Sequence, residues 1–201
     1  MELTVVACEA VYRDWGLRPL FKLAEQVAPP QLDPLLAARG YRVLDPTLVQ
    51  VAALPAEFGL STEVAAMPAL DEDWLRARQR LMGESDVELG IVRDMLSRLP
   101  VASSGFALSE AGQVVAIGLA VIQHGWVGLF DVVTDPALRR RGLGRRVVAA
   151  MLGWAAQRGA HHGYLQVVVA NAPAVALYRS FGFDTHYRYW YRAAADGSET
   201  A

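Results

Sequence analysis

Residues 139–146 read Arg-Arg-Arg-Gly-Leu-Gly-Arg-Arg, the most specific local feature of the sequence. They follow a run predicted as a strand (126–134) and open a run predicted as a helix (143–157). Gly142 and Gly144 allow the backbone to turn sharply and to approach a ligand closely, because no Cβ is in the way. Unpaired N–H groups at a helix start favour an anion, and the arginines add positive charge. The stretch therefore predicts a phosphate-binding turn.

Two other phosphate motifs do not fit this stretch. A Walker-type loop needs lysine and then Ser or Thr after its last glycine, whereas Arg145 follows Gly144. A dinucleotide-binding fingerprint needs a third glycine at the position of Val147. A solvated arginine face, or a small nucleic-acid patch, stays open as the simpler interpretation.

A second segment, residues 171–183, reads Asn-Ala-Pro-Ala-Val-Ala-Leu-Tyr-Arg-Ser-Phe-Gly-Phe. Asn171 can cap a helix, Pro173 suits the first turn of that helix, and Gly182 suits its end. Tyr178 comes one turn along, where it can face a cleft beside the helix start. Taken alone, a tyrosine on such an apolar helix is more often a core residue than a catalyst.

The pattern around these segments predicts an α+β fold. Expected strands and helices alternate from residue 61 onward: strand 61–67, helices capped by Asp71 and Ser85, strands 101–109, 113–123 and 126–134, helix 143–157, strand 164–170, helix 173–180 and strand 183–192. The gaps at 110–112 and 124–125 are short and contain glycine, which predicts an antiparallel meander.

The first 57 residues repeat the order found at the end of the chain. The order near the start is helix, Gly16, strand, helix, Gly40-Tyr41, strand. The order near the end is the same: helix, Gly159, strand, helix, Gly182-Phe183, strand. Chance similarity of such patterns is the alternative. The first copy has leucine where the second has Tyr178, so we expect residues 1–57 to be a degenerate half-domain. A connector at 55–62, a catalytic domain at 61–192 and a flexible tail at 193–201 complete the predicted organisation.

Composition excludes several classes of protein. Of the 201 residues 53% are hydrophobic and 20% charged, which is typical of a globular chain and not of a disordered one. The net charge of −2 argues against a broad basic surface for nucleic acid, and one cysteine, Cys8, excludes an internal disulfide. We see no secretory signal and no apolar run long enough for a membrane span, so we expect a cytoplasmic protein.

Together the two segments resemble the GNAT superfamily of acyl-CoA-dependent N-acetyltransferases, over about residues 61–192. Residues 139–144 match the family's Gln/Arg-x-x-Gly-x-Gly/Ala, and residues 171–183 match its Asn-x-x-Ala-x-x-Leu-Tyr-x-x-x-Gly-Phe. The resemblance implies a mixed antiparallel and parallel sheet flanked by helices. The first 57 residues look like the remnant half of a tandem member of the same superfamily.

The resemblance also implies a site that uses acetyl-CoA as co-substrate and no metal. Backbone N–H groups of the turn would hold the pyrophosphate, and a bulge in the preceding strand would make room for the pantetheine arm. Tyr178 would lie near the sulfur and act as the general acid. The cofactor-binding residues implied are Val132, Thr134, Arg139, Arg140, Arg141, Gly142, Leu143, Gly144, Arg145, Asn171 and Ala174.

We therefore expect an N-acetyltransferase that moves an acetyl group from acetyl-CoA to a primary amine by direct attack. The general base is open, since Asp131, Asp135 or a water could remove the proton. The acceptor, a small molecule or a peptide, is open as well, and the sequence is compatible with a homodimer. The alternative is a non-catalytic acyl-CoA-binding or regulatory module. His161 and His162 point apart on a strand and so do not predict a shared metal site.

Overall fold

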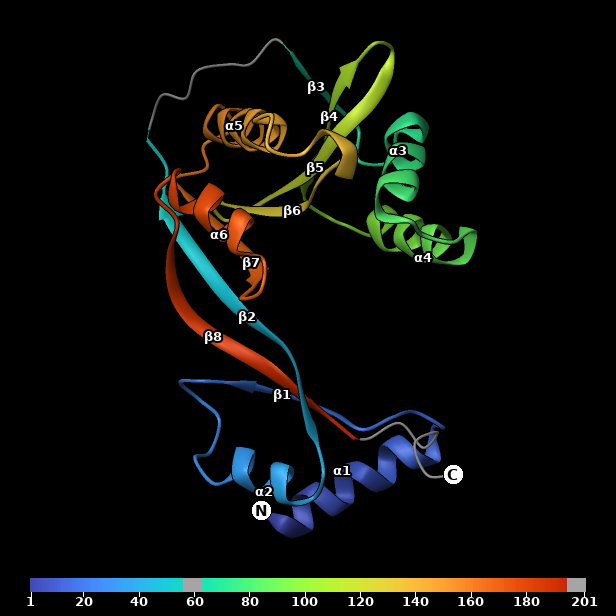
Figure 1. Ribbon diagram of the computed structural model, residues 1–201, viewed down its shortest axis with the longest axis vertical. Helices are drawn as coiled ribbons and strands as arrows, with labels where there is room; N and C mark the ends of the chain where they lie inside the picture. The colour runs from blue at the N-terminus through green and yellow to red at the C-terminus, as the bar shows by residue number, and fades with distance from the viewer. Residues whose placement is uncertain (56–62, 195–201) are drawn as a thin grey trace. The chain divides into compact units, whose positions relative to one another are not determined.

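A computed structural model describes residues 1–55 and 63–194 (Figure 1). Its helices are α1 (Glu2–Asp14), α2 (Leu32–Ala38), α3 (Glu72–Met82), α4 (Asp86–Ser97), α5 (Leu143–Ala156) and α6 (Ala172–Arg179), with a short 3-10 helix at Pro136–Leu138. Its strands are β1 (Leu20–Ala24), β2 (Arg42–Ala53), β3 (Val64–Met67), β4 (Ala102–Glu110), β5 (Gln113–Gln123), β6 (Trp126–Thr134), β7 (His162–Val168) and β8 (Asp184–Ala193). The predicted α+β class and most of the predicted bounds are confirmed.

In the described residues the eight strands follow the order β1-β8-β2-β7-β6-β5-β4-β3 in one mixed sheet. The chain divides into two compact units. The smaller comprises Met1–Gln50, Gln166–Ala176 and the chain from Thr185 onward, and the larger comprises Val51–Leu165 and Leu177–Asp184. The smaller unit thus includes segments from both ends of the chain. Most of the predicted connector and tail lies outside the described residues, and the degenerate half-domain stays a prediction.

The larger unit is built on the meander that the sequence predicts. β3, β4, β5 and β6 pair antiparallel in succession, and β6 then pairs parallel with β7. Helix α5 covers one face of these strands and α3 the other (Figure 1). Successive residues of β5 face opposite sides of the sheet, which explains why both faces are covered. Ile117 and Leu119 pack with the α3 cluster, while Gly118 faces Met151 of α5. A Cβ at Gly118 would come within 2.5 Å of the Met151 sulfur, so α5 packs closely here.

The smaller unit has a core of its own. Val5, Leu23, Leu36 and Tyr41 are buried together, and Trp190 packs against them. The Trp190 indole N–H donates to Asp33 Oδ1 over 2.6 Å, and Arg192 pairs with the same carboxylate. The Trp190 indole N–H is therefore bonded inside this unit.

Local capping signals fix the helix starts. Asp71 accepts from the N–H groups of Asp73 and Trp74 at the start of α3, and Ser85 and Glu88 form the predicted capping box of α4. None of the described helices is both long and apolar enough to cross a membrane.

Candidate functional site

The turn between β6 and α5 leaves a helix start without a side-chain cap. Arg140 and Gly142 adopt left-handed conformations, with φ of 62° and 77°. Gly142 is the N-cap and has no side chain, unlike Asp71 and Ser85 before α3 and α4. The first bond within the helix runs from the Arg146 N–H to the Gly142 carbonyl over 3.1 Å, so the N–H groups before it are available to an anion.

Gly144 brings this helix start close to two other elements. A Cβ built there would lie 3.5 Å from Thr134 Oγ1 and 3.6 Å from the Leu177 side chain. Because Gly144 has no side chain, its backbone stays accessible beside the end of β6 and the last turn of α6. Leu143 is only 2% exposed, so its side chain belongs to the core and only its backbone can meet a ligand.

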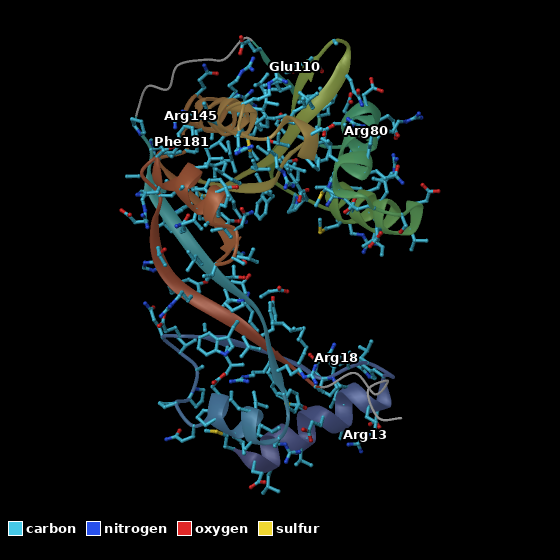
Figure 2. The ribbon with its side chains drawn as sticks, in the orientation of Figure 1. Arg13, Arg18, Arg80, Glu110, Arg145 and Phe181 are labelled. Atoms are coloured by element: carbon cyan, nitrogen blue, oxygen red, sulfur yellow. The ribbon has the colours of Figure 1, made fainter. Side chains whose placement is uncertain are left out.

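The arginines of the turn do not act as one cationic group. Arg141 donates to both carboxylate oxygens of Glu110 over 2.9 and 3.2 Å. Arg145 donates to Ser180 Oγ over 2.6 Å and its guanidinium lies 4.8 Å from the centre of the Phe181 ring (Figure 2). Arg146 donates to Glu63 over 2.7 Å. Arg139 and Arg140 are exposed, and their side chains have no bonded partner among the residues that the structure describes.

Tyr178 on α6 has a buried ring and an unbonded hydroxyl. Its side chain is 8% exposed and meets Phe183 edge-on, with ring centres 6.2 Å apart. Within the described part of the chain the hydroxyl makes no hydrogen bond. Burial raises the pKa of Tyr178 to about 12, so the phenol is protonated at neutral pH. Tyr178 follows Leu177, which lies beside Gly144.

Asn171 and Ala174 belong to the smaller unit. Asn171 Oδ1 accepts from the Ala174 N–H over 3.2 Å, which is the capping bond that the sequence predicts for α6. This bond occupies the amide oxygen, and both residues therefore have a structural role in starting the helix.

β6 carries the bulge that the family resemblance implies. Leu119 pairs with Phe130 and Ile117 with Val133, so Gly118 alone faces Asp131 and Val132. Asp131 has a φ of 50°, in the left-handed region. In the described residues the ladder with β7 runs from Trp126 to Leu129. Val132 and Thr134 therefore lie beyond the part of β6 that pairs with β7, so the edge of β6 on that side can face a ligand.

Neither of the two candidate bases, Asp131 in β6 and Asp135 just after it, is free. Asp131 Oδ2 accepts from Arg78 Nε over 2.8 Å, and Arg78 also pairs with Glu84. Asp135 Oδ1 caps the 3-10 helix by accepting from the Ala137 N–H over 3.0 Å, and the other oxygen is 3.8 Å from Arg80. Both carboxylates are already occupied, which favours removal of a proton through water.

Arg78 is the residue at this site that sequence reasoning missed. It lies four residues after the buried Trp74, on the face of α3 that packs against the sheet. A charged residue at a helix position that periodicity assigns to the core is a detectable signal.

The other conspicuous residues have structural partners. His162 stacks on Trp126 with ring centres 4.6 Å apart, and the described residues contain no group of three or more potential metal ligands. Cys8 lines an apolar cavity of about 420 Å³ in the smaller unit, together with Val5, Phe21 and Leu32.

Known proteins match nearly the whole chain. The family described as "Probable histone acetyltransferase Rv0428c C-terminal" matches residues 2–192. The uncharacterized N-acetyltransferase YobR of Bacillus subtilis is 25% identical over 189 residues, which cover 90% of this chain and 76% of YobR. The [Ribosomal protein bS18]-alanine N-acetyltransferase of Escherichia coli is 33% identical over 97 residues, covering 48% of this chain and 66% of that enzyme.

A solved structure has the same fold. The GCN5-related N-acetyltransferase from Kribbella flavida superposes with a TM-score of 0.67 at 18% identity, over 95% of this chain and 74% of that one.

Proposed function

Because the chain belongs to the family of the Rv0428c C-terminal domain, and with it to the GNAT acetyltransferases, we propose that it transfers an acetyl group from acetyl-CoA to a primary amine. The open start of α5 beside Thr134 and Leu177 is the observation that carries this proposal. A side-chain cap at this position would occupy one or two of these N–H groups and leave fewer donors for a diphosphate.

The residues of the turn fit the phosphates of coenzyme A. The N–H groups of residues 140–145 would bind the diphosphate, and Gly142 and Gly144 leave room for its oxygens. Arg139 and Arg140 are exposed cations that would add charge, whereas Arg141 and Arg145 are held by Glu110 and Ser180 and would first have to exchange partners. Binding energy at this turn therefore comes chiefly from backbone donors.

The bulged end of β6 fits the pantetheine arm and the acetyl group. When bound, acetyl-CoA supplies an activated thioester. Backbone groups of Val132 and Thr134 would pair with the arm, because these residues lie beyond the ladder to β7. The Val132 N–H would donate to the acetyl oxygen as negative charge develops on it, an interaction worth about 3 to 4 kcal/mol in acyl-transfer sites.

Tyr178 would assist the departure of sulfur. Its pKa is raised to about 12 by burial, against about 8.5 for a simple thiol. Complete transfer of the phenolic proton to a free thiolate would therefore be uphill by about 5 kcal/mol. Tyr178 is better suited to donate its proton while the carbon–sulfur bond is breaking, when charge on sulfur is still developing.

The acceptor must lose a proton before it attacks. An alkyl ammonium of pKa about 10.4 is neutral in only about one of 2500 molecules at pH 7, which costs about 4.6 kcal/mol. Asp131 and Asp135 are both engaged in bonds within the protein, so we assign this proton to a water chain. The E. coli relative is named for the alanine of ribosomal protein bS18, which makes a peptide N-terminus one acceptor class to test.

Thiol release from acetyl-CoA, measured with a panel of amines, tests the proposal. The panel contains small alkyl amines, amino acids and a peptide with an N-terminal alanine. We expect thiol release that depends on at least one acceptor. Coenzyme A binding without release for any amine would instead support an acyl-CoA-binding module. If calorimetry detects no binding of coenzyme A, and the protein binds RNA or DNA with an affinity that falls as salt is added, the turn would instead be a nucleic-acid-binding patch.

A further inference from the structure

A buried guanidinium connects α3 to the bulge of β6. Arg78 is 6% exposed, its Nε donates to Asp131 Oδ2 over 2.8 Å, and its Nη1 pairs with Glu84 in the connection between α3 and α4. Burial alone would lower the pKa of Arg78, but the hydrogen bonds and charges of Asp131 and Glu84 outweigh burial and raise it. All three residues belong to the larger unit, where α3 lies beside β5 and β6 (Figure 1).

Asp131 is the residue that makes the bulge. Its φ of 50° lies in the left-handed region, which residues with a Cβ enter only against a steric penalty. Such a conformation persists where neighbouring groups hold it. The bond from Arg78 acts on the side chain of this residue, and Val132 is the next residue along the strand.

Stability alone does not account for a charged residue at this position. The neighbouring cluster of Trp74, Leu75, Ala77 and Leu119 is apolar and would accept an apolar side chain. Replacing a buried ion pair or triad by well-packed apolar residues is often neutral or stabilising, because the charges need not then be desolvated. A role in positioning a neighbouring group accounts for the charge of Arg78 better than stability does.

We propose that Arg78 is a positioning residue that holds Asp131 in its left-handed conformation and so fixes the direction of the Val132 N–H. Glu84 holds the guanidinium from the opposite side, which connects the α3–α4 segment to the same strand. This inference rests on the proposed function for the role of Val132 in turnover, whereas the backbone conformation of residue 131 can be measured without any substrate.

Glycine and alanine at position 131 separate this role from simple loss of an ion pair. The Arg78→Met substitution leaves the Asp131 carboxylate without its partner. In that background, Asp131→Gly and Asp131→Ala both remove this unpaired carboxylate. Only glycine enters the left-handed region freely. We expect Arg78→Met to lower kcat by about 10²-fold, the cost of misplacing a reacting geometry by about 1 Å, with the coenzyme A Kd changed less than about threefold. Asp131→Gly should then restore turnover well above the level with Asp131→Ala.

The same pair of substitutions in the presence of Arg78 covers the case in which Arg78→Met does not fold. Asp131→Gly should retain about tenfold more turnover than Asp131→Ala, since only alanine opposes the left-handed conformation. Equal turnover of the glycine and alanine variants, in either background, would overturn the proposal, because the backbone conformation would then be irrelevant.

NMR gives the readout that needs no cofactor. The Cα and Cβ shifts and the HN–Hα coupling of residue 131 report its φ, and they should change in Arg78→Met but not in Arg76→Met, an exposed control on the same helix. An unchanged residue 131 in Arg78→Met would overturn the proposal. A changed residue 131 in a protein whose wild type releases no thiol with any amine would refute the proposed function and leave the positioning role standing.

Discussion

Within the described residues the hydroxyl of Tyr178 makes no hydrogen bond. It can therefore be removed without breaking a structural contact, which allows a direct test of its role. Tyr178→Phe keeps the buried ring and the edge contact with Phe183, and removes only the proton donor. We expect kcat to fall by about 10²-fold, the lower end of what general acids contribute. The coenzyme A Kd should stay within a few fold in calorimetry. Unchanged kcat would refute the acid role while leaving the phosphate turn intact.

The residue scale is also where the sequence was least informative. Arg78 and Asp131 are 53 positions apart, and no local pattern indicates that they meet. Asp131 and Asp135 both looked available as bases, and only the fold shows that one bonds to Arg78 and the other caps a 3-10 helix. The arginines of residues 139–146 likewise read as one cluster, although Glu110, Ser180 and Glu63 hold three of them.

At the scale of the element, the start of α5 can be tested by a charge placed on its N-cap. Gly142→Glu would put a carboxylate among the N–H groups that are proposed to bind phosphate, and would strain a backbone with a φ of 77°. We expect no measurable coenzyme A binding by calorimetry. A matched control is Gly159→Glu just after α5, where φ is 80° and space is equally open.

Strain of this kind costs about 1 to 2 kcal/mol at either glycine, so both variants should lose stability while only Gly142→Glu loses affinity. Retained affinity in Gly142→Glu would refute the assignment of the turn. The comparison is informative because the two glycines flank one helix and differ only in which end they occupy.

The capping box at the start of α4 leads to a separate prediction, which concerns the stability of the larger unit. Ser85→Ala removes the acceptor of the Glu88 N–H and one half of the capping box of α4. We expect the free energy of unfolding to fall by about 1 kcal/mol, measured by urea denaturation. Ser97→Ala near the end of the same helix is a control, since Ser97 only donates to the Asp94 carbonyl at the exposed surface. Equal losses in the two variants would contradict the capping role.

Elements were predicted well where their signals are local. Asp71 and Ser85 start α3 and α4 as expected, and the glycine-containing gaps at 110–112 and 124–125 separate the three antiparallel strands. The bulge was expected from the family resemblance alone, because a shift in register depends on pairing with β5, which alternation along β6 does not specify.

On the scale of the whole molecule, each compact unit holds a tyrosine that burial keeps protonated. Burial, together with the hydrogen bond that its hydroxyl donates to Glu9, raises the pKa of Tyr41 in the smaller unit to about 12, and burial alone does the same for Tyr178 in the larger unit. In the unfolded chain a tyrosine loses its proton near pH 10. The stabilising effect is therefore complete below pH 10 and is lost as pH rises toward 12, by up to about 3 kcal/mol for Tyr178.

Urea denaturation at pH 9, 10 and 11 measures this loss. We expect the free energy of unfolding to fall over this range, and Tyr178→Phe to reduce the slope because one of the tyrosines with a raised pKa no longer titrates. A slope identical to that of the wild type would contradict the raised pKa of Tyr178. Asp33→Asn serves as a control, since its carboxyl has a pKa lowered by Arg192 and titrates only at acid pH.

The pairing of β1 with β8, from Leu20 with Ala193 to Ala24 with Tyr189, sets an order of events during translation. The first fifty residues leave the ribosome long before the strand that completes their sheet is synthesised, about 140 residues later. At about 5 to 20 residues per second this interval is roughly 7 to 30 s. The cluster of Leu23, Leu36 and Tyr41 can form within the emerging chain, but for that time it lacks Trp190, and β1 lacks its hydrogen-bonded neighbour β8.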